Sequence, residues 1–200
     1  MPTPTAMSSV PTRQRREPPG RALIGLVGCV KKKVDRVAPA RDLYISALFL
    51  GRRAAVEDRA DRWFILSAEY GLLEPDQRIA PYERSLAAVS ADERRKWASE
   101  ILASLRAKLG DFDDYTFEIH AGRNYFDYGL RDGLRDAGAH VVVPTEGLAQ
   151  GQQLQYYARH IRDGSGNRSE FMGALPEEEA RRLKGDGEAN GLRWRTSGRR

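Results

Sequence analysis

The sequence is poor in the residues that build disulfides and metal sites. Its 200 residues include one cysteine, Cys29, and three histidines, His120, His140 and His160. A lone cysteine cannot form an intrachain disulfide and fits a reducing compartment, so we expect a cytoplasmic protein. So few nitrogen and sulfur ligands disfavour a structural zinc site, and we expect no metal and no other cofactor.

Long apolar runs are also missing. A membrane-spanning helix needs about 20 consecutive apolar residues, and no segment approaches that length. The first 20 residues are rich in proline, threonine and arginine and lack the apolar core of a secretory signal. With 40% apolar and 30% charged residues, the composition is that of an ordinary globular domain without membrane contact.

The net charge of +5 is unevenly distributed. Residues 1–21 carry an excess of positive charge, because only Glu17 opposes Arg13, Arg15, Arg16 and Arg21. Such an arm can hold phosphates weakly and without sequence preference, or can act only as a solubilising tail. We expect a disordered basic arm over residues 1–20, an α/β domain over 21–162, and a flexible or peripheral C-terminal tail over 163–200.

Four short apolar runs predict β-strands at residues 23–29, 63–68, 115–121 and 140–144. Helical patterns separate them, over residues 41–60, 90–109, 125–137 and from about 151 onward. Strands that alternate with helices are typical of βαβ units. The sequence therefore predicts an α/β fold with a central, mostly parallel sheet.

The second of these helices has the clearest boundaries. Ser90 and Glu93 have the spacing of a capping box, in which each side chain satisfies a free backbone N–H group. Gly110 stands where a helix commonly ends in a left-handed residue.

Parallel α/β sheets bind ligands at the carboxyl ends of their strands, so the residues after each strand are the candidate site. Cys29, Lys31 and Lys33 follow the first strand. Neighbouring ammonium groups favour a reactive thiolate, lysines hold phosphate, and a lysine that loses its proton is a nucleophile. The alternative is a packed cysteine beside a solvated turn.

Ser67, Tyr70 and Gly71 follow the second strand. Ser67 can donate a hydrogen bond to a phosphate or to a base edge, and Tyr70 can stack on a base. The alternative is a tight turn in which Gly71 supplies a positive φ angle.

Gly122, Arg123 and Tyr125 follow the third strand. Gly122 lets backbone N–H groups approach an anion, and the Arg123 guanidinium offers a bidentate fork for phosphate or carboxylate. Tyr125 is available to stack on a base. A surface arginine in an ion pair is the alternative for Arg123.

Glu146 follows the fourth strand, and Gln152 lies at the start of the helix after it. Glu146 can act as a general acid or base, or accept a hydrogen bond from a base edge. Gln152 can read a base or lie in solvent. Ser46 and Tyr82 are further candidates to line the same crevice.

These motifs, taken together and in order, resemble one family. They are Cys-x-Lys-x-Lys at 29–33, Asp-Leu-Tyr-x-Ser at 42–46, Trp-x-Ile-Leu-Ser-Ala-x-Tyr-Gly-Leu at 63–72, Pro81-Tyr82, Ala-Gly-x-x-Tyr at 121–125 and Glu146-Gly followed by Gly-Gln-Gln-Leu at 151–154. The chain is similar, over about residues 23–157, to an uncharacterised bacterial and phage domain family often labelled YaaA-like or "peroxide stress".

The first motif also resembles the Pro-Cys-Ser-x-x-Lys segment of the core domain of archaeosine synthase, whose lysine takes part in 7-deazaguanine chemistry on tRNA. Cys29 falls on the cysteine and Lys33 on the lysine, while Gly28 and Val30 stand where that segment has proline and serine. The resemblance implies a three-layer α/β/α fold like that of uracil-DNA glycosylases, with a pocket for a purine-like base or a nucleotide.

We therefore expect a nucleobase- or nucleotide-binding enzyme that modifies or excises a (deaza)purine-type base in a nucleotide, DNA or tRNA. The expected catalytic residues are Lys33, Glu146 and Cys29. The expected ligand-binding residues are Lys31, Ser46, Ser67, Tyr70, Gly71, Tyr82, Gly122, Arg123, Tyr125 and Gln152. The alternatives are a non-catalytic DNA-binding module, stress-related or phage-associated, and a glycosyl-transfer enzyme for small molecules.

Overall fold

Strand β1 (Ala22–Gly28) is the centre of a five-stranded sheet with the order β4-β3-β1-β6-β7 in this computed structural model, which describes residues 20–161, 166–178 and 180–181. Strands β3 (Arg62–Ser67) and β6 (Tyr115–His120) pair with β1 in parallel, and β7 (His140–Val142) extends the parallel sheet beyond β6. The edge strand β4 (Gly71–Leu73) is antiparallel to β3. The four strands predicted from the sequence are thus confirmed, and β4 is an addition to them.

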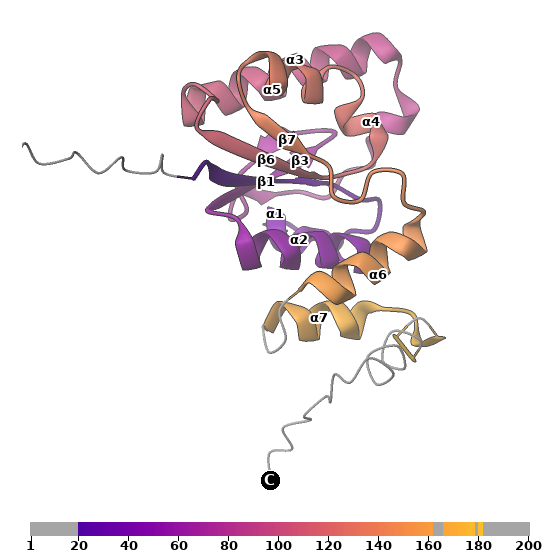
Figure 1. Ribbon diagram of the computed structural model, residues 1–200. Coiled ribbons are helices and arrows are strands. Elements are labelled where there is room, and N and C mark those ends of the chain that lie inside the picture. The colour runs from indigo at the N-terminus through magenta and orange to yellow at the C-terminus, as the bar shows by residue number, and fades with distance from the viewer. Residues whose placement is uncertain (1–19, 162–165, 179, 182–200) are drawn as a thin grey trace, which may run out of the picture.

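Helices cover both faces of this sheet, which gives three layers (Figure 1). Helix α2 (Ala47–Arg59) packs on one face and carries α6 (Gln150–His160) beside it. Helices α3 (Ala91–Leu109) and α5 (Leu130–Asp136) pack on the other face. The predicted three-layer α/β/α architecture is confirmed.

Helix α3 begins and ends where the sequence predicts. The Ser90 hydroxyl accepts from the Glu93 backbone N–H, and the Glu93 carboxylate accepts from the Ser90 N–H, at 3.2 and 3.1 Å. Gly110 ends the helix with a φ of 78°.

Two predicted helices are each divided in the structure. The segment 41–60 contains α1 (Ala40–Leu43) and α2, separated because Tyr44 adopts an extended backbone and pairs with Lys33 in an isolated antiparallel bridge. The segment 125–137 contains α4 (Arg123–Phe126) and α5, separated by Gly129 with a φ of 107°.

The remaining short elements lie in the connections. A two-stranded antiparallel sheet joins β2 (Ala38–Pro39) to β5 (Arg78–Ile79). The 3-10 helix η1 (Leu86–Ala88) precedes α3. These elements hold the loops after β1 and β4 close to the carboxyl edge of the sheet.

The packed part of the chain extends beyond residue 162. Helix α7 (Gly166–Ala174) lies against α2, on the side away from the sheet (Figure 1), and buries Phe171 and Leu175 in a second apolar cluster with Leu154 and Tyr157 of α6. The predicted basic arm and most of the predicted C-terminal tail, at 1–19 and 182–200, lie outside the described residues. Within the described part, no helix is both long and apolar enough to cross a membrane.

Candidate functional site

The order of the strands locates a crevice between β1 and β6. From β1 the chain crosses to β3 on one side and later returns to β6 on the other side, so the connections diverge at this pair. Ligands of parallel α/β folds bind at such a switch point, outside the carboxyl ends of the strands. The two strand ends lie very close together here: a Cβ atom added to Gly28 would lie 2.7 Å from the Cβ of Ala121.

Cys29 opens into a cavity of about 470 Å³ directly above these strand ends, which we call the Cys29 cavity. Tyr125 of α4 also lines it, with its hydroxyl 2.8 Å from the Cys29 Sγ and 3.3 Å from the Cys29 carbonyl oxygen, to which it donates. Burial raises the pKa of Tyr125, so its hydroxyl stays protonated. The full lining is Cys29, Val30, Lys31, Lys33, Glu83, Arg84, Ser85, Ala87, Asn124 and Tyr125.

Lys33 is held in this cavity by the backbone around it. The Val34 N–H donates to the Leu43 carbonyl oxygen at 2.9 Å, and the Ile45 N–H donates to the Lys32 carbonyl oxygen at 3.1 Å. The Lys33 ammonium lies 4.2 Å from the centre of the Tyr82 ring. Partial burial lowers the pKa of Lys33, an effect that the nearby Cys29 and Glu83 oppose.

Ser67 supports the aromatic ring beneath Lys33. Its hydroxyl donates to the Tyr82 hydroxyl at 2.8 Å, and that hydroxyl bonds to Tyr44 at 2.9 Å. Burial raises the pKa values of Tyr44 and Tyr82, which keeps both phenols neutral. Ser67 is itself fully buried, so its position is that of a support for Tyr82.

Two further cavities adjoin the Cys29 cavity along residues 80–85. One, of about 670 Å³, shares Lys31, Lys33 and Glu83 with it and is also lined by Tyr82. The other, of about 440 Å³, shares Arg84 with it.

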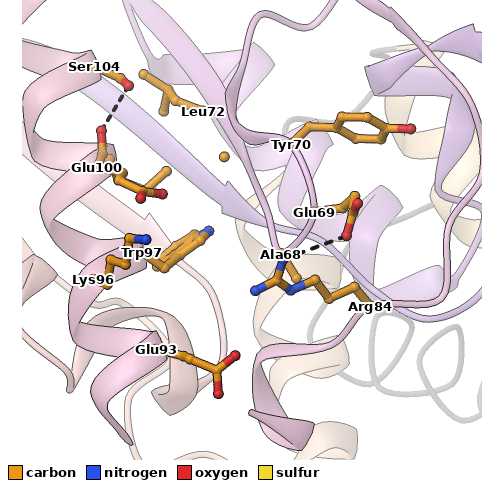
Figure 2. Close-up of a pocket in the computed structure, with 12 residues that line it drawn as sticks. Ala68, Glu69, Tyr70, Leu72, Arg84, Glu93, Lys96, Trp97, Glu100 and Ser104 are labelled. Atoms are coloured by element: carbon orange, nitrogen blue, oxygen red, sulfur yellow. Dashed lines mark hydrogen bonds and ion pairs between the residues drawn. The ribbon is translucent and has the colours of Figure 1, made fainter. Parts of the chain in front are cut away.

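The cavity of about 440 Å³ lies between α3 and the β3–β4 turn. Figure 2 shows Trp97 and its α3 neighbours on one side of it and Arg84, ion-paired with Glu69, on the other. The Trp97 ring contacts the Tyr125 ring edge-to-face at 5.6 Å, and its N–H donates to the Ser67 carbonyl oxygen. Trp97 therefore forms the wall between this cavity and the side chains of the Cys29 cavity.

Tyr70 and Gly71 lie at the β3–β4 turn and line this same cavity. Gly71 has a φ of 71°, which confirms the tight turn that its position predicts. Tyr70 is 43% exposed and contacts Tyr82 edge-to-face at 5.4 Å.

Arg123 of α4 and Glu146 of the loop after β7 belong to a separate network of ion pairs. Arg123 is 82% exposed in its side chain and donates to Asp127 at 2.7 Å. Arg131 joins Asp127 to Glu146, at 2.9 and 2.7 Å. The structure therefore does not bring Arg123 and Glu146 into contact with Lys33 or Ser67.

Three other predicted ligand-binding residues serve helix termini. Gly122 is the N-cap of the short helix α4. The Ser46 hydroxyl accepts from the Phe49 N–H at the start of α2, at 3.2 Å. The Gln152 side chain accepts from the Ala149 N–H at the start of α6, at 2.9 Å.

Arg52 is a residue of this region that the sequence analysis missed. It lies on α2 with its side chain under the end of β1, is 4% exposed, and donates to the Gly28 carbonyl oxygen at 3.4 Å and to Gln153 Oε1 at 3.2 Å. Its Nε has no hydrogen-bond partner among the residues that the structure describes. The signal was the spacing of Phe49, Arg52 and Val56, which places an arginine on the buried face of the helix.

A buried histidine continues this polar layer along β6. The Nδ1 of His120 lies 3.1 Å from the Tyr157 hydroxyl, and its Nε2 lies 3.2 Å from a Glu118 carboxylate oxygen. Burial lowers the pKa of His120, and its hydrogen bond to Glu118 opposes that shift. Neutral His120 accepts from Tyr157 and donates to Glu118. Across the described ranges, no three side chains of His, Cys, Asp or Glu gather closely enough to hold a metal ion.

Residues 24–159 match the model of a family of unknown function, DUF6884, and the chain belongs to that family. The match begins within β1 and ends within α6, so it includes every residue that lines the Cys29 cavity. No curated protein matches the chain.

Proposed function

We propose that this member of the DUF6884 family is an enzyme that binds a purine-type nucleobase or nucleotide in the Cys29 cavity and modifies or excises the base. One observation carries the proposal: two side chains with nucleophilic chemistry, Cys29 and Lys33, line a single cavity at the switch point of a parallel sheet.

Lys33 is the better placed of the two for attack on an electrophilic carbon. Its lowered pKa increases the fraction of neutral amine at neutral pH, and only the neutral amine has a free electron pair. The Tyr125 hydroxyl, neutral and close to Cys29, can donate a hydrogen bond to a ligand atom in the cavity. Lys31 and Arg84, which line the same cavity, provide positive charge for a phosphate.

The spacing of Cys29 and Lys33 supports a chemistry on deazapurine-like bases. It resembles the lysine-bearing segment of archaeosine synthase, and the order of the motifs resembles YaaA-like domains. The Tyr70 and Tyr82 rings line the two adjoining cavities and not the Cys29 cavity itself, so they can stack only on a part of the ligand that extends beyond the Cys29 cavity.

Calorimetric titration tests the proposal directly. We expect guanine, 7-deazaguanine or 5′-GMP to bind the wild-type chain, and we expect Lys33→Ala to weaken binding at least tenfold. The matched control is Lys32→Ala, because Lys32 is in the same loop but does not line the Cys29 cavity. Absence of binding heat from every one of these ligands would refute the proposal, and so would an equal loss in the control.

Deletion of residues 1–19 separates this proposal from that of a DNA-binding module. The enzyme requires only the cavity, so base or nucleotide affinity stays within a factor of two after the deletion. A module that depends on the basic arm instead loses a salt-sensitive affinity for DNA with that deletion.

A further inference from the structure

The guanidinium of Arg52 lies beneath the floor of the Cys29 cavity. A Cβ atom added to Gly28, which directly precedes Cys29, would lie 3.7 Å from the Arg52 Nη1. That nitrogen donates to the Gly28 carbonyl oxygen at 3.4 Å. Arg52 therefore lies against the strand end that carries Cys29.

The positive charge of Arg52 has no counter-ion in the described part of the chain. Its hydrogen-bond partners are the Gly28 carbonyl, the Gln153 amide oxygen and the Tyr157 hydroxyl, and these supply dipoles in place of a negative charge. Burial lowers the pKa of Arg52, yet arginine remains protonated at neutral pH. Burial of a charge without an ion-pair partner costs free energy, so the presence of Arg52 at this position requires an explanation other than stability.

The cavity above Arg52 also has more positive than negative groups. Its lining contains three basic side chains, those of Lys31, Lys33 and Arg84, and one carboxylate, that of Glu83. Arg84 is partly compensated by Glu69, at 4.0 Å. The two lysines form no ion pair within the described residues.

We propose that the Cys29 cavity binds a phosphate-bearing ligand, and that it prefers a nucleotide to a free base or nucleoside. Arg52 is then a positioning residue: its unpaired positive charge, behind the end of β1 at Gly28, attracts the phosphate. The preference for a nucleotide rests on the proposed function. The positive potential does not rest on it, because it follows from the charges around Cys29.

The potential is measured without any knowledge of the ligand. Cys29 is the only cysteine in the sequence, so alkylation reports this cavity alone. The thiolate displaces iodide from iodoacetate or from iodoacetamide: a sulfur–carbon bond forms and iodide leaves with the electron pair of the carbon–iodine bond. The ratio of the two rates, anionic over neutral reagent, cancels the thiolate fraction and reports the local charge.

We expect Arg52→Met to lower this ratio by about threefold to fivefold. Arg52→Lys keeps the charge and restores the ratio, which a merely structural role for the guanidinium would not do. Arg53→Met is the matched control, since Arg53 is the next residue on α2 but pairs with Asp42 and Glu57. An unchanged ratio in Arg52→Met overturns the proposal, as does an equal fall in Arg53→Met.

Titration with guanosine and 5′-GMP completes the test. We expect 5′-GMP to bind at least tenfold more tightly than guanosine, with most of that difference lost in Arg52→Met. Equal affinities overturn the assignment of a phosphate-bearing ligand but leave the proposed function intact. Failure of both to bind overturns the assignment of a nucleotide ligand, whereas the proposed function is refuted only if guanine and 7-deazaguanine also fail to bind. The alkylation ratio tests the positive potential in either case. A single-stranded trinucleotide that binds more tightly than 5′-GMP places the phosphate in a polynucleotide, and the reverse places it in a free nucleotide.

Discussion

The Tyr125 hydroxyl lies 2.8 Å from the Sγ of Cys29, although 96 residues separate the two in the chain. This contact joins helix α4, which follows β6, to the end of β1, and so it spans the switch point of the sheet. The side chain that limits access to Cys29 therefore comes from the opposite side of the crevice.

Removal of the Tyr125 hydroxyl should expose Cys29. We expect Tyr125→Phe to raise the rate of alkylation by neutral iodoacetamide severalfold, because the sulfur loses a close neighbour. Loss of the buried hydrogen bond should cost about 1 kcal/mol of unfolding free energy. Tyr115→Phe is the control, since its hydroxyl contacts the Leu109 carbonyl oxygen instead. Equal alkylation rates in wild type and Tyr125→Phe would show that the hydroxyl does not protect the thiol.

Ser67 should matter more for stability than its size suggests. Its oxygen also accepts from the Tyr70 and Glu69 N–H groups, at 3.0 and 3.3 Å. Ser67→Ala removes the acceptor of both groups and leaves the Tyr82 hydroxyl with its bond to Tyr44 alone. We expect a loss of about 1–3 kcal/mol in urea denaturation. Ser104→Ala, at a half-buried position on α3 where the hydroxyl donates to the Glu100 carbonyl oxygen of the same helix, should change stability by less than about 0.5 kcal/mol. Similar values for the two variants would contradict this prediction.

His120 should make the fold sensitive to acid. Because its pKa is lowered from 6.5 in the folded state, the unfolded chain takes up a proton first as the pH falls below that value. The stability therefore decreases from about pH 6.5 downward, by at most about 1.4 kcal/mol per pH unit from this residue. The pKa of Glu118 is lowered from 4.5 in the folded state, mainly by its hydrogen bond to His120. Glu118 therefore adds a further loss of stability only as the pH falls below about 4.5.

Urea denaturation between pH 7 and 5 measures this dependence. We expect His120→Gln to flatten the curve and His140→Gln, at an exposed position in β7, to leave it as in the wild type. A slope that persists in His120→Gln would assign the acid sensitivity to other groups.

Any side chain at Gly25 should destabilise the fold. A Cβ atom there would lie 2.6 Å from the Cγ1 and 2.8 Å from the Cβ of Val56, so α2 would have to move away from β1. We expect Gly25→Ala to cost about 1–3 kcal/mol. At Gly122 a Cβ atom meets nothing within 4 Å and φ is −76°, so Gly122→Ala should be neutral or stabilising by up to about 1 kcal/mol. Thermal denaturation of both variants tests the contrast, and a neutral Gly25→Ala would be inconsistent with the close packing of α2.

Local sequence was sufficient for the four parallel strands and for helix α3. The apolar runs around Leu26, Phe64 and Phe117 are short and β-rich, and the capping box at Ser90 marks a helix start without reference to the rest of the fold. The break at Tyr44 could not be predicted in this way. It depends on a bridge to Lys33, a residue in another loop.

The sequence by itself determined the four parallel strands, the boundaries of α3 and the fact that Cys29 and Lys33 follow the first strand, because these depend on periodicity and on neighbours in the chain. Only the tertiary structure decided that Tyr125 and Arg52 approach Cys29 while Glu146 pairs with Arg131. Which side chains meet at the carboxyl edge depends on the order in which strands pair and on the faces their helices cover. That order results from packing the whole chain, and no local pattern encodes it.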